Sequence, residues 1–420
     1  MDDMATADPK DAIDETLEET EEEEALISES AKLFDMFANA ANSIRKANMA
    51  AENAPHEEKV LRRFRTGEIA ELFDVTEQHI RRLAKELGNG FPEGEVVGGN
   101  RRAFTLTEIH QMRKYFKEVN PEKYKLSFED ESALKTQILC VTNFKGGAGK
   151  TTTTIHLAQR LVLKGKRVLV IDNDSQGSLT GQLGYRPNEH FEQEDTLYPF
   201  IEGTQETLHY AIRKSPWHGL DFIPAQLGLY SSEFYMPAAQ SQNGEYQFWR
   251  ALSAGLESVA DDYDVILFDN PPSLGYLALA AIYPATALII PVPPAWLDFS
   301  SAAEFFTMLS EMFEYFAKFS DDPEYDFVRI LLTNAEGDSA SNDIEGWIRE
   351  FFGRYVLTNS MPHSKVIKNA AKKTKTLYEL ETSDVPDRRS LNRALDAMNA
   401  VNDEIEELIH RAWSVDETSQ

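Results

Sequence analysis

A glycine-rich segment, Lys145-Gly-Gly-Ala-Gly-Lys-Thr151, has the residue types and spacing of a phosphate-binding loop. It follows an apolar run that is typical of a strand, and the run from Thr151 to Leu163 after it is compatible with a helix. Glycines let backbone N–H groups converge on phosphate oxygens, and a helix N-terminus adds the positive end of its dipole. Lys150 would contact the β- and γ-phosphates, while the Thr151 hydroxyl would bind Mg²⁺.

The loop differs from the common pattern Gly-x-x-x-x-Gly-Lys-Thr at its first position. Phe144 takes the place of the first glycine, and a second lysine, Lys145, stands beside it. One bound nucleotide needs only Lys150 from this loop. The second lysine therefore requires an explanation from the rest of the chain.

Two apolar runs end in acidic residues. Asp172 and Asp174 follow Arg167–Ile171, and Asp269 follows Val265–Phe268. Ligands of parallel sheets bind at the carboxyl ends of the strands, so Asp269 fits the Mg²⁺ partner of the loop. If the strand pleat continued, Asp172 and Asp174 would point to one side, one orienting the attacking water and the other helping to hold the metal. The alternative is that this pair only caps the following turn.

From residue 136 onward, apolar runs alternate with amphipathic segments. This alternation predicts an α/β fold with a doubly wound, mostly parallel sheet, here over residues 136–415. The expected strands are Ile138–Thr142, Arg167–Ile171, Leu220–Ile223, Val265–Phe268, Ala287–Val292 and Val328–Leu332.

Residues 57–117 have a different character, with 12 Lys and Arg against 10 Asp and Glu. Two short helices, Thr66–Phe73 and Thr76–Leu87, each capped by its threonine, are separated by a break and share an apolar face. Val96–Phe104 is typical of a β-hairpin, and the Thr105/Glu108 capping box opens another helix. We interpret the segment as a winged helix-turn-helix domain.

Side chains of the second helix and of the hairpin could contact nucleic acid. A mixture of polar and basic groups suits phosphate and base-edge contacts. The alternative is a purely structural three-helix module. The candidate DNA-binding residues are Thr76, Gln78, His79, Arg81, Arg82, Arg101 and Arg102.

The remaining N-terminal segments carry simpler signals. Residues 1–28 form an acidic tail that we expect to be disordered. Residues 29–56 include an amphipathic helix that should pack on the body of the protein or on a second copy of the chain, and we favour self-association. Residues 118–135 are polar and serve as a linker. Although the net charge is −28, residues 1–30 contain 13 acids and one base, so the acidic balance does not exclude local DNA-binding surfaces.

Composition excludes several classes. The chain has 42% hydrophobic residues but no run of about 18 apolar ones, so we expect no membrane span. The N-terminus lacks the features of a signal peptide, and the single cysteine, Cys140, excludes an intramolecular disulfide. The nine histidines show no metal-ligand spacing. We expect a cytoplasmic protein.

The loop Lys145–Thr151 resembles the deviant Walker A loop of the ParA/MinD ATPases. The resemblance implies that Lys145 crosses a homodimer interface to the phosphates of the partner's nucleotide. It also implies that Asp174 positions the hydrolytic water and that Asp269 is the Walker B aspartate. Over residues 57–415 the chain looks most similar to RepA partition proteins of repABC plasmids, through Val141–Gly147, Thr196–Tyr198, Thr376–Glu379 and Ala400–Glu406.

The resemblance also implies the ligands, ATP or ADP with Mg²⁺. The phosphates would be held by Lys145, Gly146, Gly147, Ala148, Gly149, Lys150, Thr151 and Thr152. Adenine contacts would come from around Asn334 and Pro362, unless these are ordinary loop residues. Ser175 and Asn270 depart from the family pattern, which usually has proline at the first position and threonine or cysteine at the second.

The C-terminal third carries a locally basic run over residues 363–393. By the resemblance, such residues bind non-specific DNA in the ATP-bound dimer, a salt-sensitive interaction with phosphates. A solvated helical face is the alternative. The candidate residues are Lys365, Lys368, Lys372 and Lys373.

Together these features predict a plasmid partition ATPase with a ParB-like partner and an operator-binding domain. A nucleotide-sensing transcription repressor without a role in segregation is the alternative. A membrane-oscillating division-site ATPase would need a basic amphipathic C-terminal helix, which the acidic residues 404–420 do not supply.

Overall fold

The computed structural model describes residues 29–51, 59–86, 90–99, 101–120, 124, 135–320 and 322–418. The chain divides into two compact units, Met1–Glu58 and Lys59–Gln420. In the first unit, the predicted amphipathic helix is α2 (Glu29–Ala51), whose Leu33, Phe34, Phe37 and Ile44 side chains are exposed. The predicted acidic tail and most of the predicted linker lie outside the described residues.

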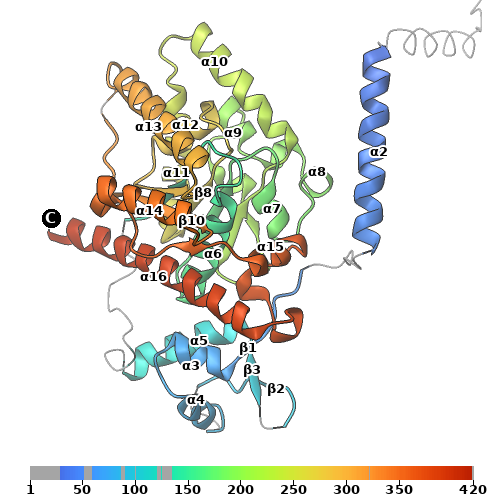
Figure 1. Cartoon of the computed structure of the whole chain (residues 1–420), viewed down its shortest axis with the longest axis vertical. Coiled ribbons are helices and arrows are strands. Elements are labelled where there is room, and N and C mark those ends of the chain that lie inside the picture. The colour runs from blue at the N-terminus through green and yellow to red at the C-terminus, as the bar shows by residue number, and fades with distance from the viewer. Residues whose placement is uncertain are drawn as a thin grey trace, which may run out of the picture. The chain divides into compact units, whose positions relative to one another are not determined.

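The second unit is built on an eight-stranded sheet, with the order β11-β10-β9-β4-β8-β5-β7-β6 (Figure 1). All neighbouring pairs are parallel except β6 and β7 at one edge. This confirms the predicted α/β class and each predicted strand. The strands are β4 (Gln137–Val141), β5 (Val168–Asp172), β6 (Arg213–Lys214), β7 (Leu220–Ile223), β8 (Val265–Asp269), β9 (Ala287–Val292), β10 (Phe327–Ala335) and β11 (Met361–Pro362).

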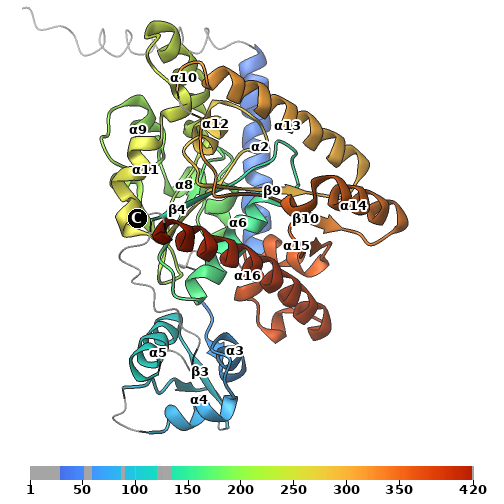
Figure 2. The ribbon, with the colours of Figure 1, turned by 90° about the vertical axis from the view of Figure 1, so that its left-hand side faces the viewer.

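Helices cover both faces of the sheet (Figure 2). Successive strand residues alternate between two apolar cores: Leu139 and Val141 belong to one, and Cys140 to the other. Helices α6 and α16 pack in the first core, whereas α12 and α13 pack in the second. The helices are α6 (Lys150–Leu163), α7 (Ser178–Gln182), α8 (Pro187–His190), α9 (Tyr198–Glu202), α10 (Ser232–Gln242), α11 (Ser253–Val259), α12 (Tyr276–Ile282), α13 (Trp296–Phe316), α14 (Ser339–Phe352), α15 (Lys365–Lys372) and α16 (Arg388–Thr418).

A small N-terminal module precedes this α/β domain. Its core is shared by Ile69, Phe73, Ile80, Phe104 and Phe116, all buried. Two short helices are followed by an antiparallel hairpin and a longer helix, in the predicted order. The elements are β1 (Phe64–Arg65), α3 (Thr66–Leu72), α4 (Glu77–Leu83), β2 (Glu95–Val96), β3 (Arg102–Phe104) and α5 (Leu106–Val119), with sheet order β1-β3-β2.

The helix caps of the module test the local predictions. Thr76 caps α4 by accepting a hydrogen bond from the His79 N–H, and Thr105 and Glu108 form the predicted capping box of α5. The prediction that Thr66 caps α3 is wrong. Arg65 is the extended residue before this helix, and the Thr66 hydroxyl donates to the Arg102 carbonyl instead. Helix α4 also ends earlier than predicted, at Leu83.

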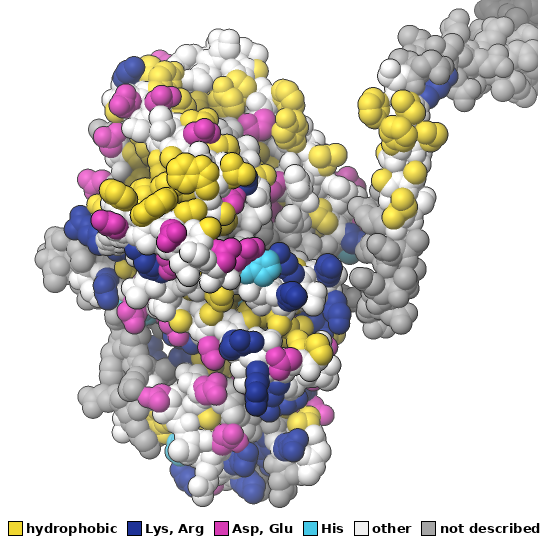
Figure 3. All heavy atoms as spheres, in the orientation of Figure 1, with side chains coloured by type: hydrophobic (Ala, Val, Ile, Leu, Met, Phe, Trp, Pro, Cys, Tyr) yellow, Lys and Arg dark blue, Asp and Glu magenta, His cyan; other side chains and the backbone are white. Residues whose placement is uncertain are grey.

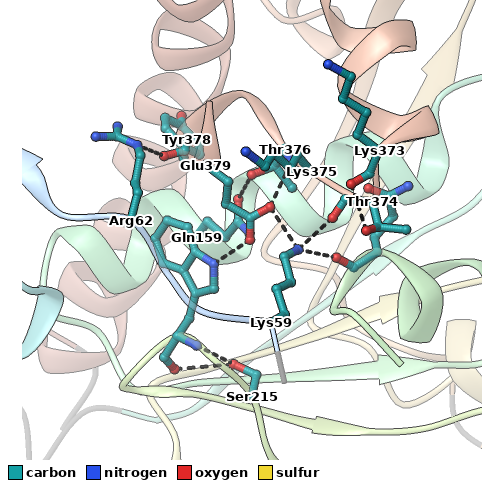
Figure 4. Close-up of polar contacts among 12 residues, drawn as sticks. Lys59, Arg62, Gln159, Ser215, Lys373, Thr374, Lys375, Thr376, Tyr378 and Glu379 are labelled. Atoms are coloured by element: carbon teal, nitrogen blue, oxygen red, sulfur yellow. Dashed lines mark hydrogen bonds and ion pairs between the residues drawn. The ribbon is translucent and has the colours of Figure 1, made fainter. Parts of the chain in front are cut away.

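Buried polar contacts dock the module on the α/β domain (Figure 4). The Lys59 ammonium forms an ion pair with Glu379 at 2.8 Å and donates to the carbonyls of Gln182 and Thr374. The Arg62 guanidinium donates to the Tyr378 carbonyl at 2.8 Å. Glu379 also accepts from the Trp217 indole at 2.9 Å, so its carboxylate joins three separate parts of the chain.

Candidate nucleotide-binding site

The glycine-rich loop joins β4 to α6 at the carboxyl edge of the sheet. Gly147 and Gly149 have φ of +79° and +95°, a left-handed conformation that side chains disfavour. The end of β10 holds this loop, since the Thr333 hydroxyl donates to the Ala148 carbonyl at 2.7 Å and the Asn334 amide to the Gly147 carbonyl at 3.2 Å. Asn334 therefore lies beside the glycine-rich loop, and its contact with adenine stays a prediction. Pro362 is near it, because β11 pairs Pro362 with Ala335.

Lys150 is the buried cation of the site. Only 7% of the residue is exposed, and its ammonium donates to the Lys145 carbonyl at 3.2 Å. Burial lowers the pKa of Lys150, while the charges of Asp269 and Asp174 oppose the shift. These two acids therefore lie close enough to act on the loop lysine.

Asp269 ends β8 and is the least satisfied group of the site. It is 1% exposed, and neither carboxylate oxygen accepts a hydrogen bond of normal geometry from any described residue. Burial raises the pKa of Asp269 and the charge of Asp172 raises it further, while the neighbouring Thr151 hydroxyl and Lys150 act in the opposite direction. A bound cation would satisfy both oxygens. The residues present thus fit Mg²⁺.

Asp172 lies beside Asp269, opposite it in the pairing of β5 with β8. Its carboxylate accepts hydrogen bonds from the Thr180 N–H and hydroxyl, at 2.8 and 2.7 Å, and so ties β5 to α7. Burial raises the pKa of Asp172 to about 7, although the Thr180 hydrogen bonds oppose the shift. A direct role of Asp172 as a metal ligand stays a prediction.

The condition for Asp172 and Asp174 to point to one side, a strand pleat that continues to Asp174, is not met. Strand β5 ends at Asp172, and Asp174 lies in the following turn, where its carboxylate accepts from the Gln176 N–H at 3.0 Å. Asp174 is half-buried. Its side chain is thus freer than that of Asp172 to face a bound phosphate.

Lys145 points away from the bottom of the loop. Its side chain is 39% exposed, and its ammonium lies 3.6 Å from the carboxylate of Asp298 in the first turn of α13. Its backbone N–H donates to the Asn143 side chain at 3.0 Å. Asp298 is a neighbour of the second lysine that the sequence analysis did not identify.

A buried amide network supports the strand ends. The Asn173 amide donates to the Asn270 side chain at 2.8 Å, and Asn270 in turn contacts the Cys140 thiol at 2.7 Å. Burial raises the pKa of Cys140, so the thiol stays neutral. Asn270 follows β8 and departs from the family pattern. Through Asn173 and Cys140 it links the end of β8 to the end of β5 and to β4.

The candidate DNA-binding residues of the module lie mostly on its surface. Thr76, Gln78 and Arg101 are exposed, as are Arg81 and Arg82, which pair with Glu77 and Glu86. His79 is half-buried instead: its ring contacts the Tyr124 hydroxyl at 2.9 Å and stacks on Phe116. The Arg102 guanidinium donates to the Glu93 carbonyl.

The four candidate lysines of the C-terminal third are all exposed. Three of them lie at Lys365, Lys368 and Lys372, a spacing that places them on one side of α15. Lys373 follows at the end of the helix. No ion pair joins any of the four ammonium groups to another described residue.

Among the described residues, no cluster of three or more His, Cys, Asp or Glu side chains could hold a metal ion. A cation at Asp269 would therefore need oxygen ligands from a hydroxyl group, water or phosphate as well. No helix in the described part of the chain is long and apolar enough to cross a membrane.

Comparison with known proteins identifies the relatives of this chain. Residues 136–318 match the family model of an AAA domain. A protein of Rhizobium rhizogenes named "Putative replication protein A" is 36% identical over 388 residues, which cover 91% of this chain and 95% of that protein. The chain belongs to the ParA/MinD-type ATPases. This family membership confirms the resemblance inferred from Lys145–Thr151.

Other members of the family support the same assignment. SopA of Escherichia coli K12 is 32% identical over 90% of this chain and 97% of its own length. The chromosome-partitioning ATPase Soj of Thermus thermophilus is 30% identical and covers 58% of this chain. A solved structure titled "Partition Protein" has a TM-score of 0.58 at 19% identity, covering 89% of this chain and 98% of that one, and so shows a common fold.

Proposed function

We propose that this protein is a plasmid partition ATPase that binds ATP or ADP with Mg²⁺ at the carboxyl edge of the sheet. The observation that carries the proposal is the buried Asp269 carboxylate, which lies beside Thr151 and Lys150 and, within the described residues, accepts no hydrogen bond of normal geometry. Thr151 and Asp269 hold the metal, with Asp172 next to them. When bound, Mg²⁺ would offset the negative charge of the phosphates.

The other residues of the site have distinct roles in the proposal. Lys150 and the backbone of Gly146–Gly149 with Thr152 bind the phosphates, and Asp174 orients the attacking water. Asn334 and Pro362 lie beside the adenine. Lys145 leaves Asp298 and contacts the nucleotide of a second subunit, so that ATP binding produces a homodimer.

Two surfaces bind DNA in this proposal. The module of residues 57–117 is a winged helix-turn-helix domain that binds an operator and represses transcription, through α4 and the hairpin. The exposed lysines of α15 bind non-specific DNA when the dimer forms, which places the protein on the nucleoid. The match to SopA covers 90% of this chain and 97% of that protein, so it includes both the module and the domain over residues 136–415.

A ParB-like partner stimulates slow hydrolysis and releases the dimer from DNA. Helix α2, within residues 29–56, self-associates through its exposed apolar side chains. A nucleotide-sensing repressor is a second candidate function. The N-terminal module is the observation that favours it.

The test compares Asp174→Ala with Lys150→Ala. We expect Asp174→Ala to bind ATP and dimerise, but to lose roughly 100-fold or more of the hydrolysis stimulated by DNA and the ParB-like partner. Lys150→Ala should lose ATP binding itself. Plasmid retention over many generations is the decisive readout: if Asp174→Ala changes operator repression but leaves retention intact, the protein is a repressor and the partition proposal fails.

A further inference from the structure

A groove of about 980 Å³ lies between the N-terminal module and the first turns of α16. One wall comes from the module, with Arg65, Arg81 and Arg101 from the start of α3, from α4 and from the hairpin. The opposite wall belongs to the α/β domain and includes Thr382 and Arg388. Figure 3 shows Lys and Arg side chains gathered over the lower part of the face in view, where the module and the first turns of α16 lie.

The charge of the groove is opposite to that of the chain. Eight arginines and five acidic residues line it, whereas the whole chain has a net charge of −28. Every cationic side chain in the lining is an arginine rather than a lysine. Guanidinium groups form paired, planar hydrogen bonds with phosphate and are weakly hydrated. This composition favours a ligand that presents several phosphates.

Three of these arginines remain available for a ligand. Among the described residues, Arg101 and Arg388 have no ion pair or side-chain hydrogen bond, and both are exposed. Within the same part of the chain, the Arg65 guanidinium donates only to the neutral Thr382 hydroxyl, at 3.1 Å. By contrast, other arginines of the groove are neutralised, such as Arg160 by Asp403 at 2.8 Å.

The two walls are held at a fixed spacing. Arg62 donates to the Tyr378 carbonyl, and His110 contacts the Val162 carbonyl at 2.8 Å, on a different helix of the α/β domain. With the Lys59–Glu379 ion pair, these contacts come from both ends of the module. The positions of Arg101 and Arg388 on opposite walls are therefore part of one folded unit.

We propose that the groove takes the phosphodiester backbone of the DNA duplex bound by the module, and that Arg388 contacts its phosphates from the α/β domain. The inference rests on the proposed operator binding, because Arg81 and Arg101 belong to both surfaces. Phosphate contacts fix the position of a duplex without specifying its sequence. The ATPase domain thus contributes one wall of the operator-binding surface.

The test measures binding of the full chain to a DNA fragment from upstream of its own gene, over a range of salt concentrations. Removing one phosphate contact should weaken binding and reduce the slope of log K against log salt by about 1. We expect this for Arg388→Ala and for Arg101→Ala. Arg388→Lys should restore most of the slope, because it keeps the charge.

Arg411→Ala is the matched control, since Arg411 lies on the same helix, pairs with Glu407 and is 74% exposed. It should bind like the wild type. If Arg388→Ala has the affinity and slope of Arg411→Ala, or binds more tightly, the inference is overturned while operator binding stands. If the wild-type chain does not prefer the upstream fragment to a random duplex of equal length, the proposed operator binding by the module fails, and the inference about the groove fails with it.

Discussion

Residue type and position next to an apolar run were enough to identify the residues that lie at the ends of the central strands. The glycines, Lys150 and Asp269 each stand beside an apolar run, so their place at the sheet edge followed from the order of residues alone. Asp298, Thr180 and Thr333 gave no such signal. They reach the site only through strand order and helix placement, which bring together residues far apart in the chain.

Asp298 leads to a prediction about the second lysine. The Lys145–Asp298 pair is partly exposed, so its attraction is worth at most about 1 kcal/mol. If Lys145 must leave Asp298 to reach a second subunit, Asp298→Asn should lower the ATP concentration for half-maximal dimerisation, roughly two- to five-fold. Sedimentation velocity at increasing ATP concentrations measures this.

Glu304→Gln is the control for that substitution, because Glu304 is an exposed acid on the same helix. It should leave the ATP requirement unchanged. A requirement that is unchanged or higher in Asp298→Asn would show that the ion pair does not restrain Lys145.

At the scale of elements, buried strands were predictable, but the backbone beside an element was not. The β5 run was found to within one residue, but its hydrophobic pattern could not show that Asp174 lies in a turn, where its carboxylate accepts from the Gln176 N–H. Likewise Thr66 has the residue type of a cap, yet its hydroxyl finds the Arg102 carbonyl across the small sheet. A tertiary hydrogen bond overrode local preference at Thr66, and a local one sets the turn at Asp174.

Helix α6 links the phosphate loop to the C-terminal part of the chain through His156. The ring is 3% exposed; Nδ1 bonds to the Thr152 carbonyl at 2.7 Å, and Nε2 accepts from the Leu377 N–H at 3.0 Å. Only a neutral ring can accept at Nε2. Burial lowers the pKa of His156 to about 4, while the Thr152 hydrogen bond opposes the shift.

This arrangement predicts a loss of stability in mild acid. With a folded pKa of about 4 against 6.5 for an ordinary histidine, the native state binds fewer protons than the unfolded state between these values. The free energy of unfolding should therefore fall as the pH drops from 6.5 toward 4, by at most roughly 3 kcal/mol. His156→Gln should give a flatter profile in urea unfolding, and parallel profiles would contradict this.

At the scale of the whole molecule, the docking of the module depends on one buried carboxylate. Glu379 and Lys59 have side-chain exposures of 5% and 15%, so loss of one charge leaves the other buried without its partner. No sequence pattern reveals this pair, because the two residues are more than 300 positions apart and each has an ordinary local context.

Glu379→Gln should therefore reduce the free energy of unfolding by roughly 3 kcal/mol, as measured by urea denaturation. Glu407→Gln is the control, because its ion pair with Arg411 is exposed and should change stability by no more than about 0.5 kcal/mol. Equal effects of the two substitutions would mean that the docking contact contributes little.

The same contact has a consequence for synthesis on the ribosome. The module is translated early, but the residues that dock it, such as Tyr378 bound by Arg62, follow 316 positions later. Because domains fold as units while the chain emerges, the module can fold and contact Val162 and Gln182 early, but its contacts with Tyr378 and Glu379 form only when almost all of the chain has been made. Lys59 and Arg62 thus lack their partners Glu379 and Tyr378 during most of translation, and completion of the docking contact is one of the last steps of folding.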